Sequence, residues 1–345
     1  KTQIIEKEKV MINNQFIGQL KGLKLELDLK IGALETDIKS LKKAARQNVG
    51  PEILSRIEQI KKGELLELKD DFKIYWGKFP IAKLAPGKDY LNPGINLIID
   101  DMVENTDQTN LLSHLLNWIN KKINEDLKSL INLKKINVKN SFVRALAYQL
   151  YENNGVIKRE TVKDFLNKIG QEERKVLRYH GVKFGRYHIF LYKLFKPSIV
   201  SLRIALWKNY HQKYIQLKPP QFGLNFVESK KYENKNFMLL CGFESFDQFF
   251  VRIDILERLF IKIMNLNNEK KDEIKLVPEM LNLLGCNKDN FLNLIKKMNY
   301  KYFEKDNETF FKYVPQKKSK KKHFVGNKKK DNPFNVLKEI SFKNV

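Results

Sequence analysis

A run of leucines and isoleucines after residue 107 constrains this chain more than any other feature. Apolar side chains recur there at three- and four-residue steps, in the order Leu111, Leu112, Leu115, Leu116, Ile119, Ile123, Leu127 and Leu130. This spacing puts them on one face of an α-helix of about six turns, with Asp107 expected as its N-cap. Helical spacings continue to residue 215, and they predict a mainly helical middle region.

The start of the chain follows a different period. In "EKVMINNQFIGQLKGLKLEL", residues 8–27, apolar and polar residues alternate on both sides of Asn13-Asn14. Alternation with a turn signal in its middle is typical of a β-hairpin. Leu23, Leu25 and Leu27 extend the same two-residue period. We therefore expect the chain to open with β-strands.

Helical spacing returns at Glu35, and two further features suggest where elements end. Gly50-Pro51 is expected to close one helix and begin another, because proline suits a first helical turn. Residues 65–84 read as strands around the turn residues Asp70-Asp71. Pro80, in that stretch, is expected on a sheet edge, because it cannot donate to a ladder of hydrogen bonds.

The last third of the ordered sequence mixes short elements. Residues 219–235 are polar and suggest a linker, after which two strands flank the turn at Ser245 to Asp247 and a helix begins near Asp254. Two short helices around Gly285-Cys286 and two strands joined at Asp306-Asn307 then match a helix-turn-helix with a wing. The alternative interpretation is a small helix and hairpin that only pack on the helical region.

These patterns predict an α+β protein, mainly α with small β-hairpins, in which a helical bundle precedes a winged-helix-like C-terminal unit. The length of 345 residues exceeds that of a usual single domain. The expected divisions are a hairpin and helix segment at 1–100, the bundle at 101–218, a strand-helix and winged-helix-like unit at 219–314, and a disordered tail at 315–345. The tail carries ten lysines, and like charges at that density repel rather than pack.

The charge balance points to a polyanionic partner. The chain has 65 Lys and Arg against 40 Asp and Glu, a net charge of +25. Such an excess is the electrostatic signature expected of a nucleic-acid binder, although a lysine-rich proteome explains part of it. Two cysteines are too few for a disulfide framework, and no apolar run approaches the roughly 20 residues that span a bilayer. We expect a cytoplasmic protein without a membrane partner.

The familiar catalytic motifs are missing from the sequence. It contains no G-x-x-x-x-G-K-[ST] phosphate loop, no G-x-S-x-G, no H-E-x-x-H and no cysteine-histidine cluster with zinc spacing. The "DEIK" at residues 272–275 matches a DExH box only superficially, because its surroundings are polar. Paired carboxylates such as Asp100-Asp101 fall where turns explain them. We predict no catalytic residue, no metal ligand and no cofactor for this chain.

The stretch "GVKFGRYHIFLYKLFKP", Gly181 to Pro197, is the strongest candidate for a binding surface. Single-strand binders combine cations for phosphates with aromatic rings for bases. The candidate phosphate contacts are Lys183, Arg186, His188, Lys193 and Lys196, and the candidate stacking residues are Phe184 and Tyr187. On the predicted recognition helix, Lys288, Lys296 and Lys297 are further candidates. The alternative is that the aromatic residues belong to the core and that His188 is a buried polar residue.

The same stretch, extended to Trp207, closely resembles the segment that follows the motor in mitochondrial-type RNA-degradosome DExH helicases and their alphaproteobacterial relatives. Further stretches agree in the same order: "LKGLKLEL", "IYWGKFPIAKLAPGKDYLNPGINLIIDD", "VRALAYQLYENNGVIKR", "CGFESFDQFFVRIDILERL" and "VPEMLNLLGC". The closing "NPFNVLKEI" is similar to the element after the basic tail in the bacterial members. The resemblance covers most of the chain and leaves the two motor lobes unrepresented.

This resemblance implies that the chain is the C-terminal accessory region of an ATP-driven RNA or DNA helicase. ATP and Mg²⁺ would bind to motor lobes upstream of Lys1, a start that is not Met and that suggests a longer polypeptide. The implied partners are single-stranded RNA or DNA, the motor lobes, and a 3′-to-5′ exoribonuclease. The family's catalytic residues have no counterparts here. The alternative functions are a scaffold that recruits a nuclease, its charge serving solubility, and a stand-alone enzyme with an unrecognised site.

Overall fold

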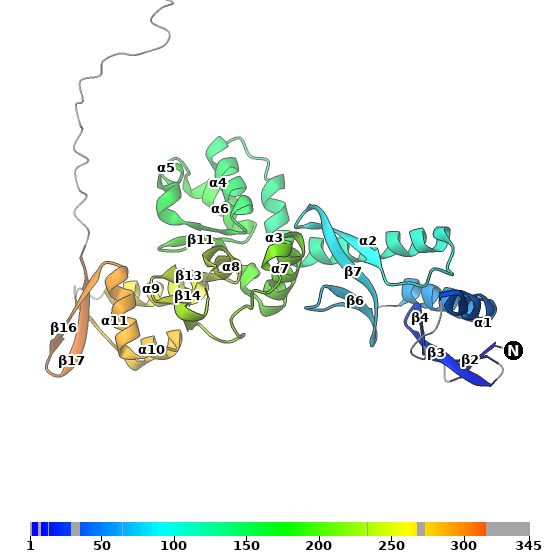
Figure 1. Ribbon diagram of the computed structural model, residues 1–345. Helices are drawn as coiled ribbons and strands as arrows, with labels where there is room; N and C mark the ends of the chain where they lie inside the picture. Colours follow the sequence, from blue (N-terminus) through cyan, green and yellow to red (C-terminus); the bar gives the residue numbers. More distant parts are fainter. Residues whose placement is uncertain are drawn as a thin grey trace, which may run out of the picture.

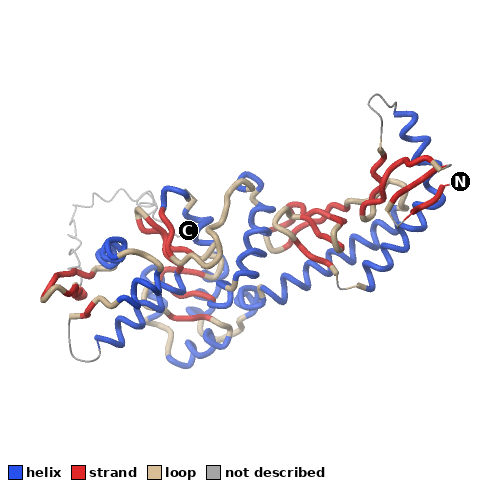
Figure 2. Tube along the Cα trace, turned by 90° about the horizontal axis from the view of Figure 1, so that it is seen from below, coloured by secondary structure: helices blue, strands red, loops and turns tan. Residues whose placement is uncertain are grey.

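The structure is a computed structural model, and it describes residues 2–5, 8–12, 14–28, 35–63, 65–232, 234–267 and 273–314. These ranges form eleven α-helices, five short 3-10 helices and seventeen strands in five antiparallel sheets, so the α+β class is confirmed. The molecule is elongated, with the N-terminal strands at one end and the last hairpin at the other (Figures 1 and 2). The predicted tail lies outside the described residues.

The chain opens with a four-stranded antiparallel sheet in sequential order. Its strands are β1 (Thr2–Ile5), β2 (Lys9–Ile12), β3 (Gln15–Lys21) and β4 (Lys24–Leu27). The β2–β3 pair is the predicted hairpin, and at its turn Asn14 has a left-handed backbone with φ of 64°. Asparagine tolerates that conformation better than most residues.

The helix α1 (Glu35–Lys62) runs without interruption through Pro51, so the prediction that Gly50-Pro51 separates two helices is wrong. A single buried stripe explains the continuity, and its members are Ala45, Val49, Ile53, Ile57 and Ile60. This stripe keeps its register across the proline, and burying it outweighs the local cost of the missing N–H. Gly50 has no Cβ to crowd the proline ring, which eases the restriction on the residue before a proline.

A second four-stranded sheet follows, again in sequential order. Its strands are β5 (Leu66–Leu68), β6 (Lys73–Trp76), β7 (Phe79–Asp89) and β8 (Asn92–Leu97). Pro80 lies on the interior strand β7, not on an edge as predicted, and the register shifts beside it between Ile74 and Tyr75. A bulge of this kind accommodates a residue that cannot donate a ladder hydrogen bond.

The long helix predicted from the leucine pattern is α2 (Asn105–Asp126). Leu111, Leu115, Ile119 and Ile123 form its buried face, as the spacing indicates. Asp107 is not its N-cap. The N-cap is Glu104, whose side chain makes no cap hydrogen bond, and Asp107 lies in the first turn, where a carboxylate still favours the positive end of the helix dipole.

The remaining helices of the middle region are shorter. They are α3 (Lys128–Ile131), α4 (Ser141–Glu152), α5 (Lys163–Leu166), α6 (Gln171–Tyr179) and α7 (Pro197–Tyr210), with the 3-10 turns η1 (Asn132–Lys135), η2 (Arg159–Val162), η3 (Tyr192–Phe195) and η4 (Gln212–Tyr214). A three-stranded sheet interrupts them, and the helical spacings did not predict it. Its order is β10 (Val182–Phe184), β11 (His188–Leu191), β9 (Val156–Lys158).

The C-terminal third begins with another three-stranded sheet, in the order β12 (Phe226–Glu228), β14 (Phe249–Arg252), β13 (Phe243–Phe246). Strand β12 falls within the stretch predicted as a linker, so that part of the prediction is wrong. The turn between β13 and β14 and the helix after it agree with the sequence pattern. The helical elements here are η5 (Ser229–Lys231), α8 (Lys235–Leu240) and α9 (Ile253–Asn267).

The chain then forms the short helices and the hairpin that the sequence pattern indicates. The elements are β15 (Ile274–Lys275), α10 (Pro278–Leu284), α11 (Lys288–Lys297), β16 (Tyr300–Lys305) and β17 (Glu308–Tyr313). Strand β17 lies between β15 and β16. A hydrophobic cluster around Phe260, Phe291 and Phe311 holds these elements to α9 and β14. The larger core cluster extends from the first sheet to α7.

Candidate nucleic-acid interface

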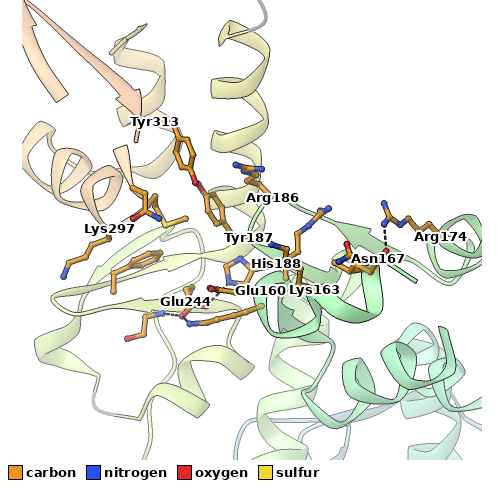
Figure 3. Close-up of a pocket in the computed structure, with 17 residues that line it drawn as sticks. Glu160, Lys163, Asn167, Arg174, Arg186, Tyr187, His188, Glu244, Lys297 and Tyr313 are labelled. Carbon is orange, nitrogen blue, oxygen red and sulfur yellow. Dashed lines mark hydrogen bonds and ion pairs between the residues drawn. The ribbon is translucent and has the colours of Figure 1, made fainter. Parts of the chain in front are cut away.

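A cleft of about 610 Å³ lies where the middle region meets the C-terminal third (Figure 3). Residues from β9, η2, α5, α6, the β10–β11 turn, β13, the end of α11 and the end of β17 line it. The lining residues are Lys158, Arg159, Glu160, Lys163, Leu166, Asn167, Arg174, Arg186, Tyr187, His188, Glu244, Ser245, Phe246, Lys297, Met298, Asn299 and Tyr313. Six of them are Lys or Arg and two are Glu, so the cleft is strongly positive.

The turn between β10 and β11 projects into this cleft. Gly185 N–H donates to the carbonyl of His188 at 2.8 Å, which closes the turn and leaves Arg186 and Tyr187 at its tip. Arg159 braces the turn twice. Its backbone N–H donates to the Tyr187 carbonyl at 2.8 Å, and its Nη1 donates to the Gly185 carbonyl at 2.7 Å.

The buried carboxylate of Glu257, on α9, holds the turn from below. It accepts hydrogen bonds from three consecutive backbone N–H groups, those of Arg186, of Tyr187 at 2.8 Å and of His188 at 2.6 Å. Successive N–H groups that converge in this way form a nest, which is an arrangement suited to an anion. Gly185 leaves room for the carboxylate, because a Cβ there would lie 2.4 Å from Glu257 Oε2.

His188 connects this nest to the wall of the cleft. It is 3% exposed, and its two ring nitrogens face two carboxylates: Nδ1 lies 3.1 Å from Glu257 Oε1, and Nε2 lies 2.8 Å from Glu244 Oε2. An ionised carboxylate only accepts hydrogen bonds, so both contacts require the doubly protonated ring. Burial lowers the pKa of His188, but the hydrogen bonds and charges of the two glutamates outweigh it and raise that pKa above its usual value.

Glu244 also forms an ion pair with Lys158, which is on β9 at the opposite wall of the cleft. Its Oε1 lies 3.2 Å from Lys158 Nζ and accepts the Ser245 backbone N–H at 3.0 Å. Burial raises the pKa of Glu244, but the hydrogen bond and charge of His188, together with Lys158, hold it below its usual value. The glutamate is therefore ionised and largely neutralised by its neighbours.

Three arginines contribute half of the cationic side chains in the cleft. Arg159 and Arg174 donate to the backbone carbonyls of Gly185 and Leu166, and the Arg186 guanidinium lies over the rings of Tyr187 and Tyr313, 5.9 and 5.8 Å from their centroids. In the described part of the chain no ion pair joins these guanidinium groups to a carboxylate. Burial lowers the pKa of Arg159, and the charges of Arg174 and Arg186 lower it further. An anion in the cleft would relieve this repulsion.

Aromatic rings stand beside these charges. Figure 3 shows Tyr313, Tyr187 and Arg186 side by side at one wall. The Tyr187 ring packs edge-on against Phe260, with 4.6 Å between centroids. Phe246 lines the cleft and stacks on Phe249 behind it, with the rings 5.7 Å apart and 26° from parallel. Rings fixed in this manner resemble the stacking platforms of single-strand binders.

The structure separates the predicted site residues into two groups. Arg186, Tyr187, His188 and Lys297 line the cleft. The other six are outside its lining, and they are Lys183, Phe184, Lys193, Lys196, Lys288 and Lys296. A strand alternates its faces, so Lys183 lies over Tyr192 with 4.7 Å between Nζ and the ring centroid, opposite to Phe184.

Each of the six residues outside the lining has a definite position. The centroid of the Phe184 ring lies 5.9 Å from the guanidinium carbon of Arg174 and 5.5 Å from that of Arg178. Lys193, on η3, and Lys196, at the start of α7, are exposed. On α11, Lys288 pairs with Glu304 at 3.3 Å, and Lys296 lies 4.8 Å from the Tyr302 ring centroid. Lys297 pairs with Asp247 at the rim.

Sequence reasoning missed four of the six lysines and arginines that line the cleft and both carboxylates that contact His188. The missed cations on β9, η2, α5 and α6 are Lys158, Arg159, Lys163 and Arg174, and the missed partners of His188 are Glu244 and Glu257. The stretch "VIKRETVKDF", residues 156–165, contains Lys158, Arg159 and Lys163, and this local density of cations would have suggested all three as candidates. The two glutamates carry no such signal, because each lies in an ordinary amphipathic stretch.

Comparison of the chain with protein-family models, with curated proteins and with solved structures found no match. The helicase resemblance therefore stays a prediction. Within the described ranges, no group of three or more His, Cys, Asp or Glu side chains is placed to hold a metal ion. None of the helices seen in those ranges has the length and apolar content that a bilayer crossing needs.

Proposed function

We propose that this chain binds single-stranded RNA or DNA in the cleft between β9–α6 and the C-terminal third. The observation that carries the proposal is the group of three guanidinium ions, Arg159, Arg174 and Arg186, none of which forms an ion pair with a carboxylate in the described residues. Guanidinium groups suit phosphate because their donors form a planar fork. Phe246 and Tyr313 stand where bases could stack against them.

In the full protein, we propose, this region belongs to an ATP-dependent RNA or DNA helicase and guides one strand past the motor lobes. The support is the resemblance along the sequence together with a cleft whose cations and aromatic rings suit a strand held by charge and stacking. ATP and Mg²⁺ would belong to the motor, and a 3′-to-5′ exoribonuclease would receive the strand. A mechanism of this kind makes affinity depend strongly on salt.

The last part of the chain, we propose, is a winged-helix-like unit of this interface. Its elements follow the order helix, strand, helix, helix, hairpin, from α9 through β15, α10 and α11 to β16 and β17, and β15 pairs with β17. In such units the helix corresponding to α11 can lie against nucleic acid. Its last residue, Lys297, already lines the cleft.

The test is fluorescence anisotropy of a labelled oligouridine over a series of salt concentrations. Each phosphate contact contributes about 0.7 to the slope of log affinity against log salt for a single strand. Because affinity falls as salt rises, this slope is negative. Arg186→Gln should reduce its magnitude by about 0.7, and replacing Arg159, Arg174 and Arg186 together should reduce its magnitude by about 2. A matched control replaces Lys183, Lys193 and Lys196, which lie outside the cleft, with glutamine.

The control variant should keep the slope of the wild type within about 0.3. If the control reduces the magnitude of the slope as much as the triple arginine variant does, the binding surface is not the cleft. Negligible binding by the wild type at low salt would favour the protein-interaction scaffold instead.

A further inference from the structure

The backbone N–H groups of Arg186, Tyr187 and His188 all donate to one carboxylate, that of Glu257, so this carboxylate fixes the shape of the turn. Glu257 is 2% exposed. A buried carboxylate accepts several hydrogen bonds most strongly when it is ionised. The side chains that the turn presents, Arg186 and Tyr187, therefore depend on a residue that does not itself line the cleft.

His188 contacts two carboxylates. Its ring lies between Glu257 on α9 and Glu244 on β13, at 3.1 and 2.8 Å. The other charged groups around this cluster are Lys158, 3.2 Å from Glu244, Arg159, which braces the turn, Arg186 in the turn itself, and the lining residue Glu160. His188 is the one histidine among the described residues that line the cleft.

The charge of the cleft follows from the protonation of this ring. Six cationic residues and two glutamates line it, a balance of four positive charges, and a protonated His188 makes five. When the ring loses a proton, one nitrogen presents a lone pair to a carboxylate. Loss of the Nε2 proton removes one of the two cationic partners of Glu244 and leaves Lys158, so the negative charge of Glu244 in the cleft is less completely neutralised.

We propose that His188 is a proton-controlled positioning residue of the cleft: its protonated ring neutralises Glu244 and fixes Glu257 under the turn, and its deprotonation weakens phosphate binding. This proposal rests on the proposed function, because it concerns the same site. The raised pKa of His188 agrees with it, since both glutamates stabilise the charged ring. The loss of one charge beside the phosphates should reduce affinity about threefold to tenfold.

The first experiment is an NMR titration of histidine-labelled full-length protein without nucleic acid. The signal of His188, assigned by its loss in His188→Gln, should titrate above the ordinary value of about 6.5. The backbone amide signals of Arg186, Tyr187 and His188 should shift with the same midpoint, because their hydrogen bonds end on Glu257. A His188 midpoint at or below the ordinary value would overturn the proposal.

The second experiment measures oligouridine affinity by anisotropy at constant low salt from about pH 6 to about pH 9. The wild type should lose affinity across the midpoint found by NMR, and His188→Gln should not. Glu244→Gln should move the midpoint to lower pH. The matched control is Glu160→Gln, which removes the same charge from the same cleft and is not one of the two carboxylates hydrogen-bonded to His188; it should raise affinity at every pH with the midpoint unchanged.

The outcomes separate the two proposals. Binding that is salt-dependent but flat with pH, while the His188 signal titrates at a raised value, refutes the role of His188 and leaves the nucleic-acid site intact. The role of His188 is also refuted if Glu160→Gln moves the midpoint as far as Glu244→Gln does. Absence of binding at every pH refutes the nucleic-acid site, and the role of His188 with it.

Discussion

Replacing Gly185 with alanine tests whether the cleft depends on the packing of Glu257. A Cβ at this position would lie 2.4 Å from both Cδ and Oε2 of Glu257 and 2.8 Å from the carbonyl oxygen of His188. The carboxylate cannot withdraw freely, because three backbone N–H groups and the His188 ring hold it. Either the turn or α9 must therefore move.

The size of the effect follows from those contacts. Overpacking a buried position costs about 1–3 kcal/mol, and losing one hydrogen bond to a charged group costs about 1.5–3 kcal/mol more. We expect Gly185→Ala to lower the free energy of unfolding of this part of the protein by roughly 2.5–6 kcal/mol. Oligouridine affinity should fall with it, because Arg186 and Tyr187 sit on the displaced turn.

Urea unfolding followed by circular dichroism measures the loss, and hydrogen exchange of the Arg186 to His188 amides shows whether it is local. The matched control is Gly94→Ala, on β8, where a Cβ meets its nearest atom at 3.5 Å, an ordinary contact. That variant should change stability by less than about 1 kcal/mol. If both alanine variants unfold at the same urea concentration as the wild type, the turn is not held as tightly as the contacts indicate.

Further predictions concern stability, pH and thiol reactivity. Trp207→Ala should cost about 3–5 kcal/mol in urea unfolding, because its ring packs on Tyr214 and Phe237; a loss under 1 kcal/mol would contradict this. Since the pKa of His188 is raised in the folded state, its contribution to stability is complete below about pH 6.5 and is lost as pH rises through the raised value. Urea midpoints should therefore decline with pH more in the wild type than in His188→Gln, and equal slopes would speak against it. Burial raises the pKa of Cys241 to about 12 and that of Cys286 to about 11, so a colorimetric thiol reagent at about pH 8 should label both slowly in the native protein and rapidly in urea; rapid native labelling would show that the thiols are exposed.

Much of the local structure could be predicted from the sequence. The period of the apolar residues located α2 and the β2–β3 hairpin, because a helix face and a strand face each repeat within a few residues. The turn residues Asp306 and Asn307, both with positive φ, mark the final hairpin as the pattern indicated. Composition alone gave the excess of positive charge.

The errors have a physical pattern of their own. Pro51 was expected to end the helix. The buried apolar stripe from Ala45 to Ile60 spans the proline, and its burial stabilises α1 by more free energy than the lost hydrogen bond costs. Short strands such as β9 and β12 were missed, because three residues carry too little periodicity and their pairing partners lie elsewhere in the chain. Local propensity predicts secondary structure poorly wherever packing against distant parts of the chain determines it.

The candidate site shows the same division between local and long-range information. Sequence alone identified the tip of the β10–β11 turn, where Arg186, Tyr187 and His188 follow one another. Only the tertiary structure could show that Glu257, 71 residues away from Arg186 along the chain, belongs to the site. It alone could also show that Tyr313, on the last strand, lies beside Arg186. The reason is that a binding cleft is defined by which charges converge in space and which of them find a carboxylate, and neither property is written in the order of neighbouring residues.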